Sequence, residues 1–92
     1  MNNTVTVPLQ RPIEDADGKT IVALTFREAD LGDLIAGDHF KGETARAAAI
    51  LASMAGIPFP IMKKVKAIDM AAILDQAGPL MGNAPTSTTG ET

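Results

Sequence analysis

The dipeptide Asp17-Gly18 lies between two stretches in which apolar and polar residues alternate. Both residues of such a pair tolerate the positive φ angles that the tightest hairpin turns require. The sequence therefore predicts an antiparallel β-hairpin over residues 4–27. A two-residue turn at this point places residues opposite each other when their numbers sum to 35, so that Ile13 faces Val22.

This register collects apolar side chains on one face of the hairpin, because residues directly opposite each other share a face. Two charged residues, Arg11 and Glu28, interrupt that face. Pro8 and Pro12 lack the amide donors of a ladder and can break the first strand into pieces. A two-stranded hairpin is marginal alone, so its apolar face must pack on the rest of the chain. The apolar set on this face is Val7, Leu9, Ile13, Val22, Leu24 and Phe26.

Three later segments carry apolar residues at helical spacing, and Pro60 can start a further short helix, so that these segments supply the partner layer. Asp30 and Asp69 are suited to cap the first and the last of these helices. The four segments are residues 31–38, 43–55, 60–66 and 69–81. The apolar stripes in the first, second and fourth are Leu31, Leu34 and Ile35, then Ala47, Ile50, Leu51 and Met54, then Met70, Ile73, Leu74 and Ala77.

The predicted fold is α+β, with an N-terminal β-hairpin packed on three or four short α-helices in a single domain over residues 1–82. A chain of this length buries only about 60–65% of its unfolded surface, which leaves one modest core and no room for a deep cleft. Residues 83–92 contain no core-forming residue and are expected to be a disordered tail.

The composition excludes several classes of function. A net charge of −3 and a pI near 4.9 argue against nucleic-acid binding, which requires a basic surface. The absence of cysteine excludes disulfides, thiolate chemistry and cysteine-ligated zinc. The N-terminus lacks the features of a secretory signal, and the longest apolar stretch is too interrupted by Arg, Gly and Pro to span a bilayer. These features predict a soluble cytoplasmic protein.

No catalytic or metal-binding set can be assembled from the sequence. His39 is the only histidine, and it lies in a glycine-flanked link between two helices. Ser53 lies inside a helix and Ser87 in the tail, and neither has the surroundings of a nucleophile. The acidic stretch around Gly18 lacks the ligand spacing of a calcium loop. We therefore predict no catalytic residues, no metal and no cofactor.

The segment LTFREADLGDL, residues 24–34, turns from a strand into a helix within a charged corner. Asp30 can cap the helix, and Asp33 puts negative charge in its first turn, where the helix dipole favours it. Arg27 is close enough in sequence to pair with Asp30 or Asp33. We interpret the corner as structural: it sets the angle between the hairpin and the first helix.

Candidate partner-binding residues are apolar and lie near prolines and helix ends. Methionine lines surfaces that accept varied apolar partners, and it also fills gaps in cores. Both interpretations remain open at this point, as they do for the basic cluster KKVK at residues 63–66, which suits a solvated helix end or an acidic partner. The candidates for an exposed binding patch are Phe59, Ile61, Met62 and Met81.

The order of these motifs resembles the tail assembly chaperones of contractile-tailed, Mu-like phages and prophages. The resemblance covers roughly residues 4–80 and rests on RPI, DADGK, LTFREADLGDL, MAGIP and IDMAAIL in that order. The corner segment is its sharpest element, and the GIP after the second helix is a weaker one. The segment from Pro60 to Lys63, which belongs to the third predicted helix, departs from the acidic character expected there.

This resemblance implies a non-enzymatic protein that binds the tape measure protein of a phage tail and keeps it soluble while tail tube subunits polymerise around it. Such a chaperone acts in the host cytoplasm and is absent from the mature virion. The tail tube protein and a second copy of the chain are further candidate partners. In related phages a programmed frameshift extends the chaperone, and residues 83–92 would suit a linker, but a frameshift is a property of the nucleotide sequence.

A different class of function fits the same residues. A small phage-encoded adaptor or regulatory domain would bind one globular host or phage protein in a single complex and would have no affinity for amphipathic helices. The position of the gene distinguishes the two, because a chaperone gene is expected between the tail tube and tape measure genes.

Overall fold

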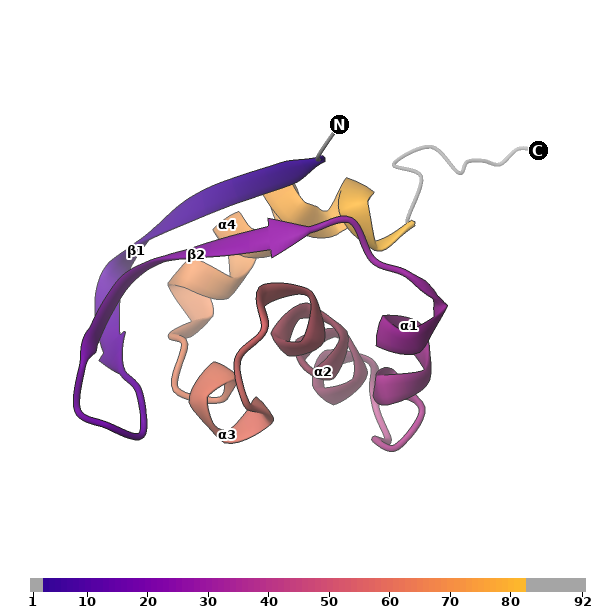
Figure 1. Ribbon diagram of the computed structural model, residues 1–92, viewed down its shortest axis with the longest axis horizontal. Coiled ribbons are helices and arrows are strands. Elements are labelled where there is room, and N and C mark those ends of the chain that lie inside the picture. Colours follow the sequence, from indigo (N-terminus) through magenta and orange to yellow (C-terminus); the bar gives the residue numbers. More distant parts are fainter. Residues whose placement is uncertain (1–2, 83–92) are drawn as a thin grey trace.

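The computed structural model describes residues 3–82. A two-stranded antiparallel hairpin arches over a set of short helices, so the predicted α+β class is confirmed (Figure 1). The predicted tail at 83–92 lies outside the described residues. The elements, in chain order, are β1 (Thr4–Glu14), β2 (Thr20–Arg27), α1 (Leu31–Gly37), α2 (Glu43–Ala55), α3 (Phe59–Met62), α4 (Ala67–Ala77) and the 3-10 helix η1 (Gly78–Met81).

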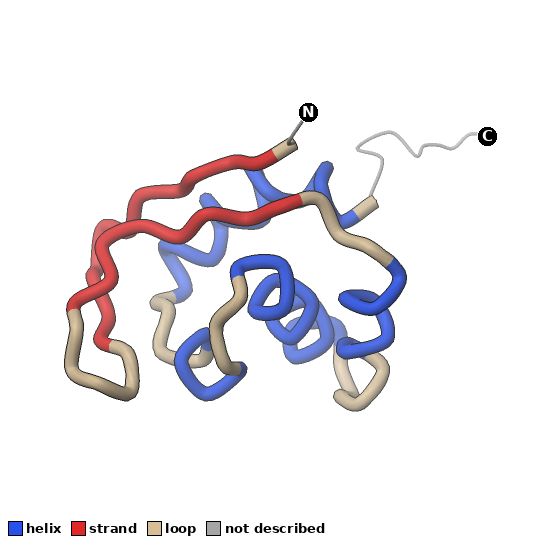
Figure 2. Tube along the Cα trace, viewed as in Figure 1, coloured by secondary structure: helices blue, strands red, loops and turns tan. Residues whose placement is uncertain are grey.

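The predicted hairpin register is wrong, because the turn is longer than two residues. The last pair before the turn is Glu14 with Thr20. One oxygen of the Asp15 carboxylate accepts hydrogen bonds from the backbone N–H groups of Asp17 and Lys19, both at 2.9 Å. Within this turn, Gly18 has a positive φ of +82°. The side chain of Asp15 thus stabilises a wider loop than the Asp-Gly pair alone predicts. This loop lies at the edge of the molecule (Figure 2).

A large bulge in β1 shifts the register a second time. Val7 lies opposite Leu24 and Pro8 opposite Ala23, whereas Ile13 lies opposite Ile21. Between these pairs β1 contains residues 9–12 and β2 contains only Val22. Val22 is 61% exposed, so its predicted place on the buried face is wrong, while the other five apolar residues of that face are buried.

A carboxylate from α4 holds the bulge in place. Asp69 is only 1% exposed, and its two oxygens accept the backbone N–H groups of Gln10 at 2.8 Å and Arg11 at 2.9 Å. Bulged residues lose their partners in the ladder, and these two donors find theirs on Asp69. Asp69 is therefore not the predicted N-cap of the last helix. That position is Lys66, which places Asp69 in the first turn.

The helix bounds differ from the prediction where prolines or extended residues intervene. The segment 43–55 is helical as predicted, and α1 ends at Gly37. The predicted helix at 60–66 is a single turn, because Lys66 is extended and α4 begins directly after it. The predicted helix at 69–81 begins at 67 and ends at 77, where Pro79 prevents continuation and a 3-10 turn follows.

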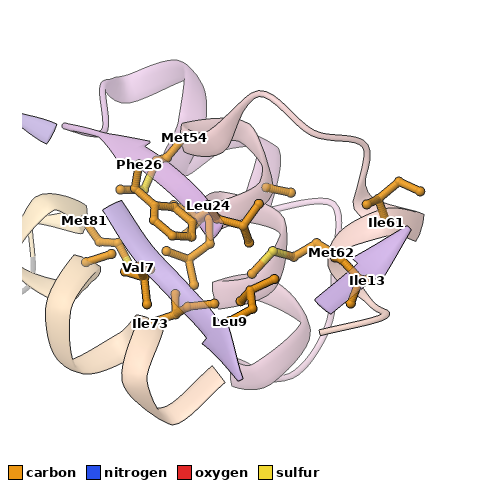
Figure 3. Packing of buried hydrophobic residues seen from close by; sticks show 14 residues of the cluster. Val7, Leu9, Ile13, Leu24, Phe26, Met54, Ile61, Met62, Ile73 and Met81 are labelled. Carbon is orange, nitrogen blue, oxygen red and sulfur yellow. The ribbon is translucent and has the colours of Figure 1, made fainter. Parts of the chain in front are cut away.

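The hydrophobic core lies between the hairpin and the helices (Figure 3). Val7 and Phe26 of the hairpin and Ile73 of α4 have no exposed surface, and Met54 of α2 is also buried. The helix α4 packs on β1, whereas α2 packs on β2, α1 and α3. The two long helices are thus attached to different strands of the hairpin.

The seven-residue helix α1 buries a different face from the one that the sequence predicts. Its buried residues are Asp33 and Gly37, whereas Leu31, Leu34 and Ile35 are exposed. The stripe expected to face the hairpin therefore faces away from the core. Two contacts explain this orientation: Asp33 is bound by polar groups of β2 and α2, and Gly37 lies directly against α2.

The contact at Gly37 leads to a stability prediction. A Cβ at this position would lie 2.8 Å from Cγ1 of Ile50 and 2.9 Å from Cγ of Arg46, which is closer than side chains tolerate. We expect Gly37→Ala to lower the free energy of unfolding by about 1–2 kcal/mol, the usual cost of overpacking. Urea unfolding measures this change. The control is Gly78→Ala, because Gly78 has helical φ and ψ and nothing within 4 Å of its added Cβ. An equal loss in both variants would contradict the close approach of α1 to α2.

Candidate functional site

The charged corner at residues 27–33 joins three elements. Arg27 at the end of β2 donates two hydrogen bonds to Asp33, from Nη1 to Oδ2 at 2.7 Å and from Nη2 to Oδ1 at 2.8 Å. Ser53 of α2 donates its hydroxyl to the same carboxylate. Asp30 and Asp33 form a reciprocal capping box at the start of α1, and Asp30 lies 3.9 Å from Arg27.

The corner carboxylate is strongly perturbed by its partners. The hydrogen bonds from Arg27 hold the pKa of Asp33 well below its usual range, and the Ser53 hydroxyl and the Asp30 amide act in the same direction. The bond to Asp33 also raises the pKa of Arg27. Ser53 Oγ is engaged in this network, so its hydroxyl proton is directed at a carboxylate that stays ionised at neutral pH. These contacts are those of a structural joint between β2, α1 and α2.

Within residues 3–82, no three His, Asp or Glu side chains lie together as metal ligands would. His39 is exposed in the loop after α1. Over the same residues, no helix combines the length and the apolar character needed to cross a bilayer.

An apolar groove lies between α2 and α4. The two helices contact different strands and make little direct contact with each other, so the hairpin holds them apart. The groove has two adjacent halves, which share Thr44, Met70 and Leu74 in their linings. The α1-side half has a volume of about 510 Å³ and the α3-side half about 720 Å³. Leu74 is 42% exposed, so apolar surface of α4 faces solvent inside the groove.

The two halves differ in charge. The α1-side half is bordered by Glu43 and Arg46, which carry opposite charges. Of the described residues that line the α3-side half, Lys63 is the only charged one. The other residues lining the α3-side half, apart from the three shared ones, are Ala45, Ala48, Phe59, Met62, Val65, Ala67 and Ala71.

The four predicted binding residues are buried or half-buried, so they do not form the exposed patch that was expected, and their role in binding a partner stays a prediction. Ile61, Met62 and Met81 belong to the core, and Met62 is only 2% exposed. Met62 and Phe59 contribute to the α3-side half of the groove and Met81 to the α1-side half, whereas Ile61 lines neither. Each of these side chains follows a proline or a helix end, but the short α3 and η1 fold these ends against the core.

Phe59 is half-buried and takes part in a small aromatic cluster. Its ring stacks on that of Phe40 with 4.3 Å between centroids, and Lys63 Nζ lies 5.9 Å from its centroid. Lys64 donates to the backbone carbonyl of Glu14 at 3.1 Å. The three lysines of the cluster at residues 63–66 are exposed. Lys63 lines the α3-side half of the groove, whereas Lys64 and Lys66 line a hollow beside Glu14.

Sequence reasoning missed the residues that border the groove most openly. Met70 and Leu74 belong to a stripe that the sequence assigns to the packing face of the last helix. Ile73 and Ala77 fill the core from that stripe, and Met70 and Leu74 are left in the groove. The feature of the sequence that could have revealed these two residues is the width of the apolar stripe, which is greater than one strand of a hairpin can cover.

The chain matches the model of a known protein family. The model of a family described as phage tail assembly chaperone proteins, E, or 41 or 14, matches residues 6–82. No curated protein and no solved structure matches the chain significantly. The family match covers both strands of the hairpin, the charged corner and all of the helices, and the chain therefore belongs to the phage tail assembly chaperone family.

Proposed function

We propose that this chaperone binds the tape measure protein of its phage and keeps it soluble while the tail tube is assembled around it. It works without catalysis in the host cytoplasm and leaves before the virion is complete. Family membership supports the general role in tail assembly. The choice of the tape measure protein as client rests on what the resemblance to phage tail assembly chaperones implies, and the apolar lining of the groove supports it.

The observation that carries the proposal is the apolar groove between α2 and α4. A long tape measure protein that has not yet been enclosed exposes the apolar faces of amphipathic helices. Such a helix inserts residues spaced at i, i+3, i+4 and i+7 into a hydrophobic groove on its partner. Met70 and Leu74 on one side and Ala47 and Ala48 on the other provide apolar walls with small residues that allow close approach.

Weak binding in each groove and a negative net charge suit a chaperone that binds its client in many copies. Each groove is shallow, so a single contact is expected to be weak, and several copies along one client strengthen capture by avidity. The net charge of −3 keeps copies of the chaperone soluble around the client. These properties fit a protein that must release its client when the tube forms.

A charge placed in the groove tests the proposal. We expect Ala71→Glu or Leu74→Glu to reduce capture of the tape measure protein at least about tenfold, because a carboxylate would be buried unpaired against an apolar helix. Both side chains are exposed in the free protein, so the melting temperature should change little. The matched control is Gln76→Glu, which adds the same charge to an exposed position of α4 outside the groove.

Co-expression with the tape measure protein from the same genome provides the measurement. The wild type and Gln76→Glu should keep the client in the soluble fraction and co-purify with it, whereas the groove variants should leave it insoluble. If the client is equally soluble without the chaperone and does not co-purify with it, the proposed function is wrong. Capture that survives both groove variants would place the client on another surface.

A further inference from the structure

Two exposed apolar side chains of α1, Leu31 and Ile35, lie outside the core and line neither half of the groove, whereas Leu34 of the same helix lines the α1-side half. Leu31 is 70% exposed and Ile35 is 50% exposed on a helix of only two turns. A soluble protein rarely leaves adjacent large apolar residues uncovered on one helix face unless another molecule covers them. The polar corner and Gly37 fix this face outward, so the exposure follows from specific contacts and not from loose packing.

The charges around this face indicate what covers it. The segment 28–38 contains four acidic residues and no basic one. Asp33 is buried in an ion pair with Arg27, whereas Glu28, Asp30 and Asp38 are exposed around the apolar residues. A partner surface for α1 must therefore be apolar, wide enough for one helix and basic at its border.

The chain itself carries a surface with these properties. The α3-side half of the groove is apolar, has a volume of about 720 Å³, and is lined by Lys63 without any acidic residue among its described lining. Lys64 and Lys66 follow Lys63 in the chain and are also exposed, and they line a neighbouring hollow beside Glu14 of β1. The ridge made by Leu31 and Ile35 has the i, i+4 spacing with which a helix packs into a groove.

We propose that α1 of one copy inserts into the α3-side half of the groove of the next copy, so that the chaperone associates with itself head to tail. Leu31 and Ile35 enter between α2 and α4 of the neighbour, and Asp30 and Asp38 lie near its lysines. The donor and acceptor surfaces differ, so the contact is heterologous and extends to rings or open chains rather than stopping at a symmetric dimer. The inserted helix would cover the groove until a client takes its place.

Sedimentation of the chaperone alone tests this inference without any client. The wild type should show an average mass that rises with concentration and falls with added salt, because screening weakens the acid–lysine attraction. Leu31→Glu and Ala71→Glu should each weaken association at least tenfold, through the ridge and the groove respectively. Val22→Glu is the matched control, since Val22 is exposed on the hairpin and belongs to neither surface. Thermal melts of all variants show that each one folds.

Mixing the two defective variants distinguishes head-to-tail association from any symmetric contact. Leu31→Glu retains an intact groove, and Ala71→Glu retains an intact α1 ridge. Their mixture should form a 1:1 dimer that grows no further, because the remaining two surfaces are both blocked. A wild type that stays monomeric at every concentration overturns the inference, as does association that resists either variant or a mixture that forms no dimer. The tape measure protein is absent from these experiments, so their failure leaves the proposed client unaffected.

Discussion

Asp33→Ala is expected to lower the free energy of unfolding by about 3–4 kcal/mol. The substitution leaves Arg27 without its bidentate partner and removes the acceptor for the Ser53 hydroxyl and the Asp30 amide. Removing one member of a buried, hydrogen-bonded ion pair costs about 3–5 kcal/mol, and the partial exposure of Arg27 places this case toward the lower end. Urea unfolding at pH 7 measures the loss.

The matched control is Asp38→Ala. Asp38 is an exposed carboxylate at the C-terminal end of the same helix, where negative charge is unfavourable. Its removal should be neutral or slightly stabilising. Similar losses for Asp33→Ala and Asp38→Ala would contradict the assigned role of the corner.

The same carboxylate predicts how stability depends on pH. The pKa of Asp33 is lower in the folded chain than the value near 3.9 of an unfolded aspartate. The folded state thus binds this proton less readily, so the stabilisation is complete above about pH 5 and is lost as the pH falls through the folded pKa. The difference between wild type and Asp33→Ala should therefore narrow below about pH 4. A constant difference from pH 7 to pH 3 would contradict the low pKa.

Asp69→Ala is expected to lower the free energy of unfolding by about 3 kcal/mol. Its carboxylate is buried and accepts hydrogen bonds from two backbone N–H groups in the bulge of β1. Hydrogen bonds to a charged acceptor contribute about 1.5–3 kcal/mol each. The variant recovers part of this free energy, because water can bind the two N–H groups at the bulge. In a domain of this size the melting temperature should fall by more than about 10 °C. The bulge is predicted to loosen as well, so the amides of Gln10 and Arg11 should exchange with solvent faster.

Asp75→Ala is the control for this second prediction, because Asp75 is an exposed carboxylate on the same helix. It should change the free energy of unfolding by less than about 0.5 kcal/mol. A small effect of Asp69→Ala, with unchanged exchange at Gln10 and Arg11, would show that the bulge does not depend on α4.

The fold class follows from local patterns, but the register and the helix orientations do not. The apolar alternation of residues 4–27 and the helical stripes after residue 42 are local features, and they yield the hairpin and the extent of α2. The register depends on Asp15 within the turn and on Asp69, which acts on the bulge from a helix far along the chain. No window of neighbouring residues contains that second interaction.

The candidate site depends on orientations that periodicity alone could not provide. In α1, Asp33 and Gly37 lie four residues apart on one face of the helix, and this face is buried instead of the apolar stripe. Asp33 is bound by Arg27, and Gly37 permits the close approach of α2. In α4 the buried Asp69 fixes the rotation of the helix, which leaves Met70 and Leu74 beside the groove. Buried polar and small residues thus decide which apolar residues remain available to partners.

The central claim is that a client helix occupies the groove between α2 and α4, and the methionine methyl groups report on it directly. Met70 lines both halves of the groove, whereas Met54 is in the core and lines neither. With methyl-labelled methionine, addition of an amphipathic segment of the tape measure protein should move the Met70 signal most and leave Met54 unchanged. A bound segment that leaves Met70 unchanged would contradict the account.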